Sequence, residues 1–313
     1  DVLVIALGSV PNTYGVAGVE THSLPFKDIS DALRIRNRTL ALMESATHAP
    51  SPGKTRVAVV GAGYSGAELA AALADFLRAV FRKFYQSAPI PAVSLIDAVD
   101  RVTPAFTPGL SAAAARALRR RGVELWLGSA VEEVNEEGVR LADGQMIKAA
   151  TVVWSAGVTA HPLVATIGLP TERGRIVVDG HMQAVPGVFA VGDVALVPAG
   201  EADISPLTAQ FALRQGRYLG KNLPVLLTGT LSVPPFRYET KGELVSLGHR
   251  NAVGQVLGVP VSGLIGWFLW RSYYLMQLPT LLRKARVAID WTLDVMFPPD
   301  VAWIPSSDLG PGA

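Results

Sequence analysis

The sequence has no cysteine among its 313 residues. This absence excludes disulfide bonds, thiolate metal sites, iron–sulfur clusters and redox-active cysteine pairs, so any redox chemistry must come from a bound cofactor. Histidine is also scarce, with five copies in the chain. They lie far apart, and no two of them are three or four positions from one another. That spacing predicts no metal site on a helix face.

Charged residues are few as well, at 17% of the chain, and 28 basic against 26 acidic side chains leave a net charge of +2. Such a balance excludes a nucleic-acid-binding protein that relies on bulk positive charge. Hydrophobic residues make up 50% of the sequence, which excludes a disordered chain and leaves room for contact with lipid.

No apolar run is long enough to cross a bilayer. The strongest candidate, residues 256–270, is interrupted by three glycines and a proline and is stopped by Arg271. A membrane-spanning helix needs roughly 20 apolar residues. We therefore expect no bilayer-crossing helix.

What the chain does contain is an alternation of strand-like and helix-like segments after a Pro/Gly-rich linker at residues 49–54. The expected order is strand 56–60, helix 65–85, strand 93–97, helix 110–121, strand 124–127, a hairpin over 131–141 and strand 151–154. Strands separated by helices imply a parallel sheet and an α/β fold. Two short strands, at 175–179 and 188–191, and a helix over 205–227 are expected to follow.

The clearest motif is the run of Gly61, Gly63 and Gly66 between the strand at 56–60 and the next helix. The first glycine permits a tight turn, the second lets the backbone approach a pyrophosphate, and the third lets helix and strand pack closely. Asp97 ends the next strand, where its carboxylate can accept from ribose hydroxyls, although it lies 31 positions after Gly66 rather than roughly 20. An ordinary strand–turn–helix remains the alternative to a dinucleotide site.

Two acidic residues occupy positions with both a structural and a functional explanation. Glu68 is expected in the first turn of the helix after the glycines, where the positive helix end alone would favour it. Asp193 follows the buried-type strand 188–191, at the end of a strand where open α/β sheets bind ligands. A helix N-cap is the structural alternative for Asp193.

Taken together, these residues resemble a known family. The run LVIALGS at residues 3–9, the glycine motif with Glu68, the run WSAGV at 154–158, Gly192-Asp193 and residues 208–210 resemble the two-dinucleotide-binding flavoproteins. Within that superfamily the chain is most similar to type II NADH dehydrogenase, a non-proton-pumping NADH:quinone oxidoreductase. The lack of cysteine separates it from the disulfide-reductase branch.

The resemblance implies a Rossmann-like NADH domain inserted in a partial FAD domain, with a C-terminal membrane-associated helical tail. The expected boundaries are 1–52 and 161–230 for the two parts of the FAD domain, 53–160 for the NADH domain and 231–313 for the tail.

The resemblance also assigns roles to individual residues. Glu68 is placed near the nicotinamide and, with Gln210, is expected to act in catalysis. The quinone pocket is assigned to Gln210, Arg214 and Gln215, although Arg214 stands where the family motif has its second glutamine. The residues implied in cofactor binding are Gly61, Gly63, Gly66 and Asp97 for NADH, and Gly157, Gly192, Asp193, Thr208 and Ala209 for FAD.

The largest departure from the family is at the front, where its own GxGxxG segment for FAD is absent. We therefore expect the sequence to be the C-terminal portion of a larger flavoenzyme. The competing hypothesis is a non-catalytic, membrane-associated module that binds NADH only.

The tail predicts a membrane contact. Residues 271–286 contain Arg271, Arg283, Lys284 and Arg286 and no acid, which gives this segment +4. With the apolar residues of 278–297, it describes a basic amphipathic helix lying at a membrane surface. Trp267, Trp270, Trp291 and Trp303 support an interfacial location. A homodimer interface is the alternative, and the expected location is peripheral, at the cytoplasmic face of the cell membrane.

Overall fold

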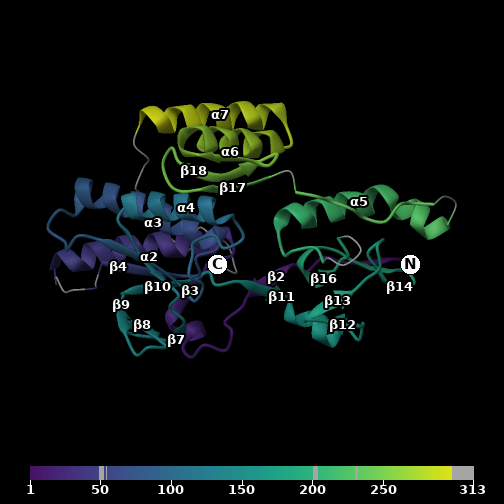
Figure 1. The fold of residues 1–313 in the computed structure, drawn as a ribbon, viewed down its shortest axis with the longest axis horizontal. Helices are drawn as coiled ribbons and strands as arrows, with labels where there is room; N and C mark the ends of the chain where they lie inside the picture. Colours follow the sequence, from purple (N-terminus) through teal and green to yellow (C-terminus); the bar gives the residue numbers. More distant parts are fainter. Residues whose placement is uncertain (49–52, 54, 200–203, 230–231, 241, 298–313) are drawn as a thin grey trace. The chain divides into compact units, whose positions relative to one another are not determined.

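The computed structural model describes residues 1–48, 53, 55–199, 204–229, 232–240 and 242–297 (Figure 1). Most of the linker expected at 49–54, and Trp303, lie outside these residues. The chain divides into two compact units. Unit 1 comprises Asp1–Asn12 and Gly157–Thr240, and unit 2 comprises Thr13–Ala156 and Lys241–Ala313.

Unit 2 is built on a five-stranded sheet in which all neighbouring strands are parallel. In spatial order its strands are β3 (Ser23–Pro25), β10 (Thr151–Trp154), β4 (Arg56–Val60), β5 (Ala92–Asp97) and β6 (Val123–Leu127). The parallel sheet expected from the sequence is thus confirmed, with its strands separated by helices or longer crossover segments.

Both faces of this sheet are covered, and the side chains of β4 show how. Val57 and Val59 belong to one buried cluster, and Ala58 and Val60 belong to another, as the two-residue period of a strand requires. The first cluster includes residues of α2 (Ile29–His48), α3 (Tyr64–Phe84) and α4 (Pro108–Arg120). The second includes residues of the antiparallel meander of β7 (Val131–Asn135), β8 (Gly138–Leu141) and β9 (Met146–Lys148). Burial on two faces explains why the strands are almost continuously apolar.

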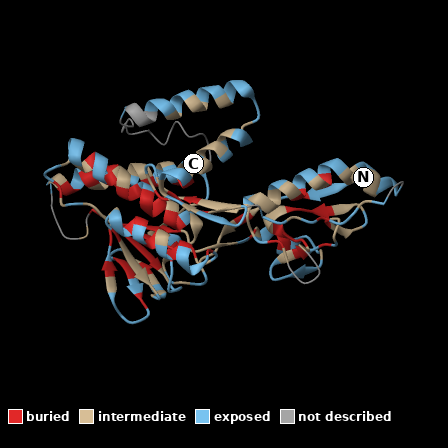
Figure 2. Cartoon of the chain, turned by 45° about the horizontal axis from the view of Figure 1, so that its top comes forward, coloured by how far each residue is buried: buried red, intermediate tan, exposed pale blue. Residues whose placement is uncertain are grey.

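Buried residues gather in the helices and strands of the chain's interior (Figure 2), and helix α3 contributes nine of them. Its alanines let it lie close to the sheet, and Ala67, Ala70 and Ala71 are fully buried. The helix begins at Tyr64. Glu68 is therefore its fifth residue and not part of the first turn, so the helix-end explanation expected for this carboxylate is wrong.

The first 48 residues do not all follow the expected domain boundary. Strand β3 pairs with β10 and α2 packs in the core of the five-stranded sheet, so residues 13–48 belong to unit 2. The short helix α1 (Val19–His22) precedes β3 in the same unit. The sequence had placed residues 1–52 with the flavin domain, because no local pattern shows which sheet a three-residue strand will join.

The C-terminal part of unit 2 is an antiparallel sheet followed by two helices. Its strands are β17 (Gly242–Ser246), β18 (Ala252–Val256) and β19 (Val259–Ser262), and its helices are α6 (Gly263–Gln277) and α7 (Leu281–Met296). The apolar run at 256–270 is thus divided between a hairpin and a helix. Gly266 lets α6 lie against β18, because a Cβ there would be 2.7 Å from the carbonyl oxygen of Ala252. Among the described residues no helix is long and apolar enough to span a membrane.

Unit 1 contains smaller sheets around one apolar core. The first joins β1 (Leu3–Ile5), β15 (Val188–Ala190) and β14 (Gln183–Val185), the second β2 (Ser9–Pro11) and β11 (Val158–Ala160), and the third β12 (Thr171–Glu172), β13 (Arg175–Val177) and β16 (Ala195–Leu196). Two 3₁₀ turns, Pro162–Thr166 and Gly192–Val194, and helix α5 (Ala209–Thr228) complete it. The helix begins at Ala209, later than expected, because Thr208 has an extended backbone conformation and is its N-cap.

Candidate functional site

The Gly61–Gly66 loop joins β4 to α3, and each glycine meets a different constraint. Gly61 has a φ of +105°, and a Cβ there would lie 2.5 Å from the backbone of Ser155. A Cβ on Gly66 would lie 1.8 Å from the carbonyl oxygen of Gly61, so helix and loop touch directly. Around Gly63 a Cβ would meet nothing within 4 Å. The loop therefore has two glycines fixed by packing and one that leaves space for a ligand to approach.

The first N–H groups of α3 follow directly on Gly63. Gly63 is the N-cap and has no side chain to accept from them, and the first turn of any helix leaves its N–H groups without intrahelical acceptors. Such a helix start binds phosphate groups. The donor set and the open side of Gly63 therefore fit a dinucleotide pyrophosphate.

Asp97 ends β5 beside the loop. Its Oδ2 accepts from the Ala62 N–H at 2.5 Å and its Oδ1 accepts from the Val99 N–H at 2.8 Å. The loop is fixed further by the N–H of Thr103, which donates to the Ala62 carbonyl at 2.7 Å. A carboxylate has about four acceptor positions, so Asp97 can hold the loop and still accept from ribose hydroxyls.

Glu68 lies one turn further along α3 and is largely buried. Its Oε1 accepts from the Ser246 N–H, on β17, at 2.8 Å. Burial raises the pKa of this carboxyl group, while the Ser246 N–H and the indole N–H of Trp270 act in the opposite direction. A carboxyl group with a raised pKa is able to hold or release a proton under mild conditions.

In unit 1 the Gly192–Asp193 turn is held by side chains from two other segments. The Ser9 hydroxyl donates to Asp193 Oδ2 at 2.5 Å, and the Gly192 N–H donates to Gln215 Oε1 at 2.8 Å. Gln215 is almost fully buried. The structure thus places Gln215 beneath the turn, in a positioning role that the sequence did not predict. The sequence signal that could have predicted this role is a glutamine at a core-facing position of α5.

The other two residues assigned to the quinone pocket lie together on α5. The Tyr238 hydroxyl donates to Gln210 Oε1 at 3.1 Å, and the guanidinium of Arg214 lies 4.1 Å from the centre of the Tyr238 ring. The sequence did not predict Tyr238, because residues 232–240 show no periodic pattern. Thr208 is the N-cap of α5 and Ala209 is its first residue. Gly157, with a φ of +131°, accepts from the Asn12 N–H at 3.0 Å.

Each unit therefore carries one cluster of the predicted residues. Unit 2 brings together the three glycines and Asp97, with Glu68 on the same helix, and unit 1 brings together the Gly192–Asp193 turn and the start of α5. A parallel sheet with a glycine-rich loop that fits a pyrophosphate, in a chain with a second unit that carries a Gly-Asp turn, is the arrangement expected of the oxidoreductases that pair a pyridine nucleotide with a flavin.

The family models agree with this class. The model of pyridine nucleotide-disulphide oxidoreductases matches residues 1–216, and the model of the NDH2 C-terminal domain matches residues 240–299. The chain belongs to the type II NADH dehydrogenase family. This membership confirms the resemblance, the enzyme class and the expected cofactors, FAD and NADH.

Individual relatives support the assignment. The chain is 31% identical to a probable NADH dehydrogenase of Dictyostelium discoideum, over 96% of this chain and 69% of the relative. It is 32% identical to the type II NADH:quinone oxidoreductase of Staphylococcus aureus, over 84% of this chain and 67% of the relative.

Solved structures show the same fold at lower identity. NDH2 from Plasmodium falciparum in complex with NADH superposes with a TM-score of 0.86 at 19% identity, over 96% of this chain and 79% of that one. A ferredoxin reductase from Rhodopseudomonas palustris superposes with a TM-score of 0.64 at 24% identity, over 82% of this chain and 57% of that one.

Proposed function

We propose that the protein oxidises NADH through FAD and passes the electrons to a membrane quinone. The observation that carries the proposal is the Gly61–Gly66 loop, with an open approach at Gly63 and with Asp97 hydrogen-bonded beside it. Residues 53–160 would bind NADH, residues of unit 1 would hold FAD, and the C-terminal region would sit on the membrane.

Residues 53–160 would bind and orient NADH. The N–H groups at the start of α3 would receive the pyrophosphate, and Asp97 would accept from the adenosine ribose. Asp97 would also repel the 2′-phosphate of NADPH, because two negative charges would meet in a partly screened position. The proposal therefore includes a preference for NADH over NADPH.

Residues of unit 1 would bind and orient FAD. Asp193, fixed by Ser9, would accept from the hydroxyls of the ribityl chain, and the N-terminus of α5 at Thr208 and Ala209 would face the pyrimidine edge. Gly157 and Gly192, both with positive φ, would form the backbone turns that border the cofactor. FAD, when bound, supplies the group that accepts a hydride and releases electrons singly or in pairs.

Two further groups would act on the substrates. Glu68, whose pKa is raised by burial, would lie near the nicotinamide and hold a proton there. Gln210 would offer its amide to the quinone, with Arg214 as the neighbouring cation on the same helix face. Gln215 supports the Gly192–Asp193 turn and would act on the quinone only through that turn.

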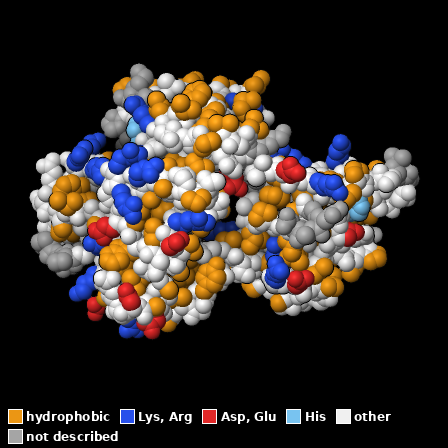
Figure 3. All heavy atoms as spheres, viewed as in Figure 1, with side chains coloured by type: hydrophobic (Ala, Val, Ile, Leu, Met, Phe, Trp, Pro, Cys, Tyr) orange, Lys and Arg blue, Asp and Glu red, His pale blue; other side chains and the backbone are white. Residues whose placement is uncertain are grey.

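The membrane contact would be made by α6 and α7, over which apolar side chains gather in Figure 3. Leu281 and Leu282 are 83% and 82% exposed, and no described residue of α7 is buried. The basic segment expected at 271–286 is not one helix, because Arg271 lies on α6 and the other three basic residues lie on α7. The guanidinium carbon of Arg271 lies 4.4 Å from the centre of the Trp267 ring and 4.5 Å from that of the Trp291 ring. Arg283, Lys284 and Arg286 remain at the start of α7 for an anionic surface.

Vesicle co-sedimentation tests this contact. Leu281→Asp with Leu282→Asp should release the protein from anionic vesicles at every salt concentration, because it removes apolar burial. Arg283→Gln with Lys284→Gln should weaken binding at low salt only. Equal sedimentation of all variants, or a dimer that dissociates in the leucine variant, would instead make α7 a protein interface.

The function itself is tested by steady-state oxidation of NADH, with a soluble short-chain quinone as acceptor and added FAD. NADH should support quinone reduction at least about tenfold better than NADPH at limiting concentration. The alternative is an NADH-binding module without catalysis. A purified chain that binds NADH but shows no flavin absorbance after incubation with FAD would favour that alternative.

A further inference from the structure

Helix α3 faces the C-terminal sheet along a polar seam, defined here as Tyr64, Glu68 and Asp75 with their partners. The Tyr64 hydroxyl donates to Glu243, Glu68 accepts from the Ser246 N–H, and Asp75 accepts from the His249 N–H at 2.7 Å. At 3.6 residues per turn these three positions of α3 fall within about 40° of one another. The seam therefore runs along one face of the helix that follows the nucleotide loop.

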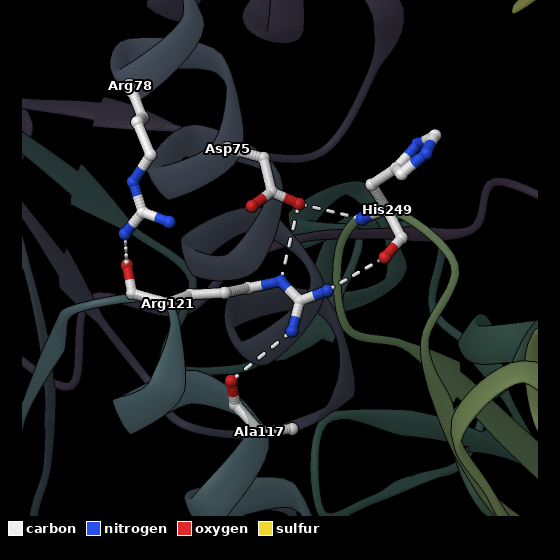
Figure 4. A network of polar contacts seen from close by, with 5 residues as sticks. All are labelled: Asp75, Arg78, Ala117, Arg121 and His249. Carbon is white, nitrogen blue, oxygen red and sulfur yellow. Dashed lines mark hydrogen bonds and ion pairs between the residues drawn. The ribbon is translucent and has the colours of Figure 1, made fainter. Parts of the chain in front are cut away.

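The far end of the seam is a structural anchor (Figure 4). Arg121 forms an ion pair with Asp75 at 3.3 Å and donates to the His249 carbonyl at 2.9 Å. Gly248 passes so close that a Cβ there would lie 2.3 Å from the Asp75 carboxylate. Val245 and Leu247 belong to the same buried cluster as the apolar residues of α3. Together, these contacts fix the β17–β18 turn against α3.

The near end of the seam is different, because it reaches the nucleotide loop itself. Tyr64 directly follows Gly63 and is the first residue of α3, so its backbone N–H belongs to the expected pyrophosphate site. Its ring packs on Phe106 with centroids 4.9 Å apart. Burial and the neighbouring carboxylate raise the pKa of its phenol, which therefore remains a donor to Glu243 at neutral pH.

Only this contact of the seam depends on a side chain of the C-terminal sheet. Glu68 and Asp75 accept from backbone N–H groups, which any residue supplies, whereas Tyr64 needs the carboxylate of Glu243. We propose that Glu243 is a positioning residue of the NADH site, which holds Tyr64 and thereby the Gly61–Gly66 loop in the conformation that binds the nucleotide. The inference rests on the proposed function of that loop.

The expected effect follows from preorganisation. If the loop loses its anchor and occupies the binding conformation only a tenth to a third of the time, the apparent Kd rises by the inverse of that fraction. Tyr64→Phe and Glu243→Ala should therefore each weaken NADH binding about threefold to tenfold. The double variant should be no weaker than the worse single variant, because both remove the same contact.

The experiment is a set of binding titrations of the 313-residue chain with NADH and with ADP-ribose, which lacks the nicotinamide. Glu243→Gln keeps an acceptor oxygen and should retain most of the affinity for both ligands. Asp75→Asn is the matched control: it loses the ion pair at the far end and should lower the melting temperature, while leaving both Kd values within about twofold.

Three outcomes are distinct. Coupled losses in Tyr64→Phe and Glu243→Ala, shared by NADH and ADP-ribose, support the proposal. Unchanged or additive Kd values, or an equal loss in Asp75→Asn, overturn it while NADH binding by the unsubstituted chain stands. If the unsubstituted chain binds neither ligand, the proposed function of the loop fails together with the inference.

Discussion

In unit 2 the candidate nucleotide loop follows strand β4, whose side chains are buried on both faces of a five-stranded sheet, whereas in unit 1 the Gly192–Asp193 turn follows a strand of a three-stranded sheet. The loop is shaped by backbone packing at Gly61 and Gly66. The turn is shaped by two side-chain hydrogen bonds, from Ser9 and to Gln215. The two sites should therefore respond to different kinds of substitution.

The largest effect is expected at Gly66. Gly66→Ala places a methyl group against the Gly61 carbonyl and should cost about 3 kcal/mol or more of unfolding free energy, with loss of NADH binding. Gly63→Ala is the matched control, because its Cβ enters open space. It should keep stability within about 0.5 kcal/mol and still weaken NADH binding roughly tenfold, by blocking the pyrophosphate. Calorimetric unfolding measures the stability of each variant, and NADH titration measures its affinity. Equal losses of unfolding free energy in Gly66→Ala and Gly63→Ala would show that the contact of Gly66 with the Gly61 carbonyl does not matter for stability.

In unit 1 the corresponding test is at Gln215. Gln215→Leu keeps the volume but leaves the partly buried Gly192 N–H without its acceptor, which should cost about 1 kcal/mol and lower the FAD content. Gln210→Leu, on the same helix, should leave FAD content unchanged and raise KM for the quinone. The FAD-to-protein ratio by absorbance is the measurement. If Gln210→Leu lost more flavin than Gln215→Leu, the roles given to the two glutamines would have to be exchanged.

A smaller effect is expected for nucleotide choice. Asp97→Asn keeps an oxygen for the Ala62 N–H, gives up the acceptor of the Val99 N–H and removes the charge that disfavours a 2′-phosphate. The ratio of the NADPH to the NADH dissociation constant should fall about tenfold, close to 1.4 kcal/mol, with a loss of about 1 kcal/mol in stability from the broken hydrogen bond. A ratio that stays the same in the variant would place the ribose away from Asp97.

The smallest effect concerns Glu68, and its sign depends on pH. Burial raises its pKa above the model-peptide value of 4.5, so the proton it binds stabilises the fold below that value, and this stabilisation is lost as pH rises through the folded-state pKa. Glu68→Gln should thus unfold at a higher temperature than the parent chain near neutral pH and at the same temperature below pH 4. The control is Glu20→Gln, at an exposed position on α1.

Thermal unfolding across pH, together with turnover in the same buffers, gives the two measurements for Glu68. Turnover should fall in Glu68→Gln although stability rises, because the variant cannot hold a transferable proton. A variant that is both as active and as stable as the parent would leave the carboxyl group without a role.

Local sequence patterns predicted the strands and the helix around the candidate nucleotide loop well. The strand at 56–60 and the glycine motif after it carry part of their own constraint, since Gly66 meets Gly61 within one strand–turn–helix, whereas Gly61 meets Ser155, which follows β10. The helix from Tyr64 and the position of Asp97 at the end of β5 each follow from the local pattern of their own segment. For these elements the sequence predicts most of the secondary structure.

The rest depends on partners distant in sequence, which a single sequence does not contain. Ser9 and Asp193 are 184 positions apart, Glu68 and Ser246 are 178 apart, and Tyr64 and Glu243 are 179 apart. Helix α6 was missed because its glycines disfavour a helix locally, while Gly266 is needed for its contact with β18. Tertiary packing decided each of these cases.

The most direct test of the central claim is anaerobic mixing of the FAD-loaded chain with NADH, followed by its visible flavin absorbance. NADH should bleach the flavin band, a short-chain quinone should restore it, and Gly63→Ala should slow the bleaching at limiting NADH. A flavin band that stays unchanged while NADH binds to the same sample would contradict electron transfer from NADH to FAD in this protein.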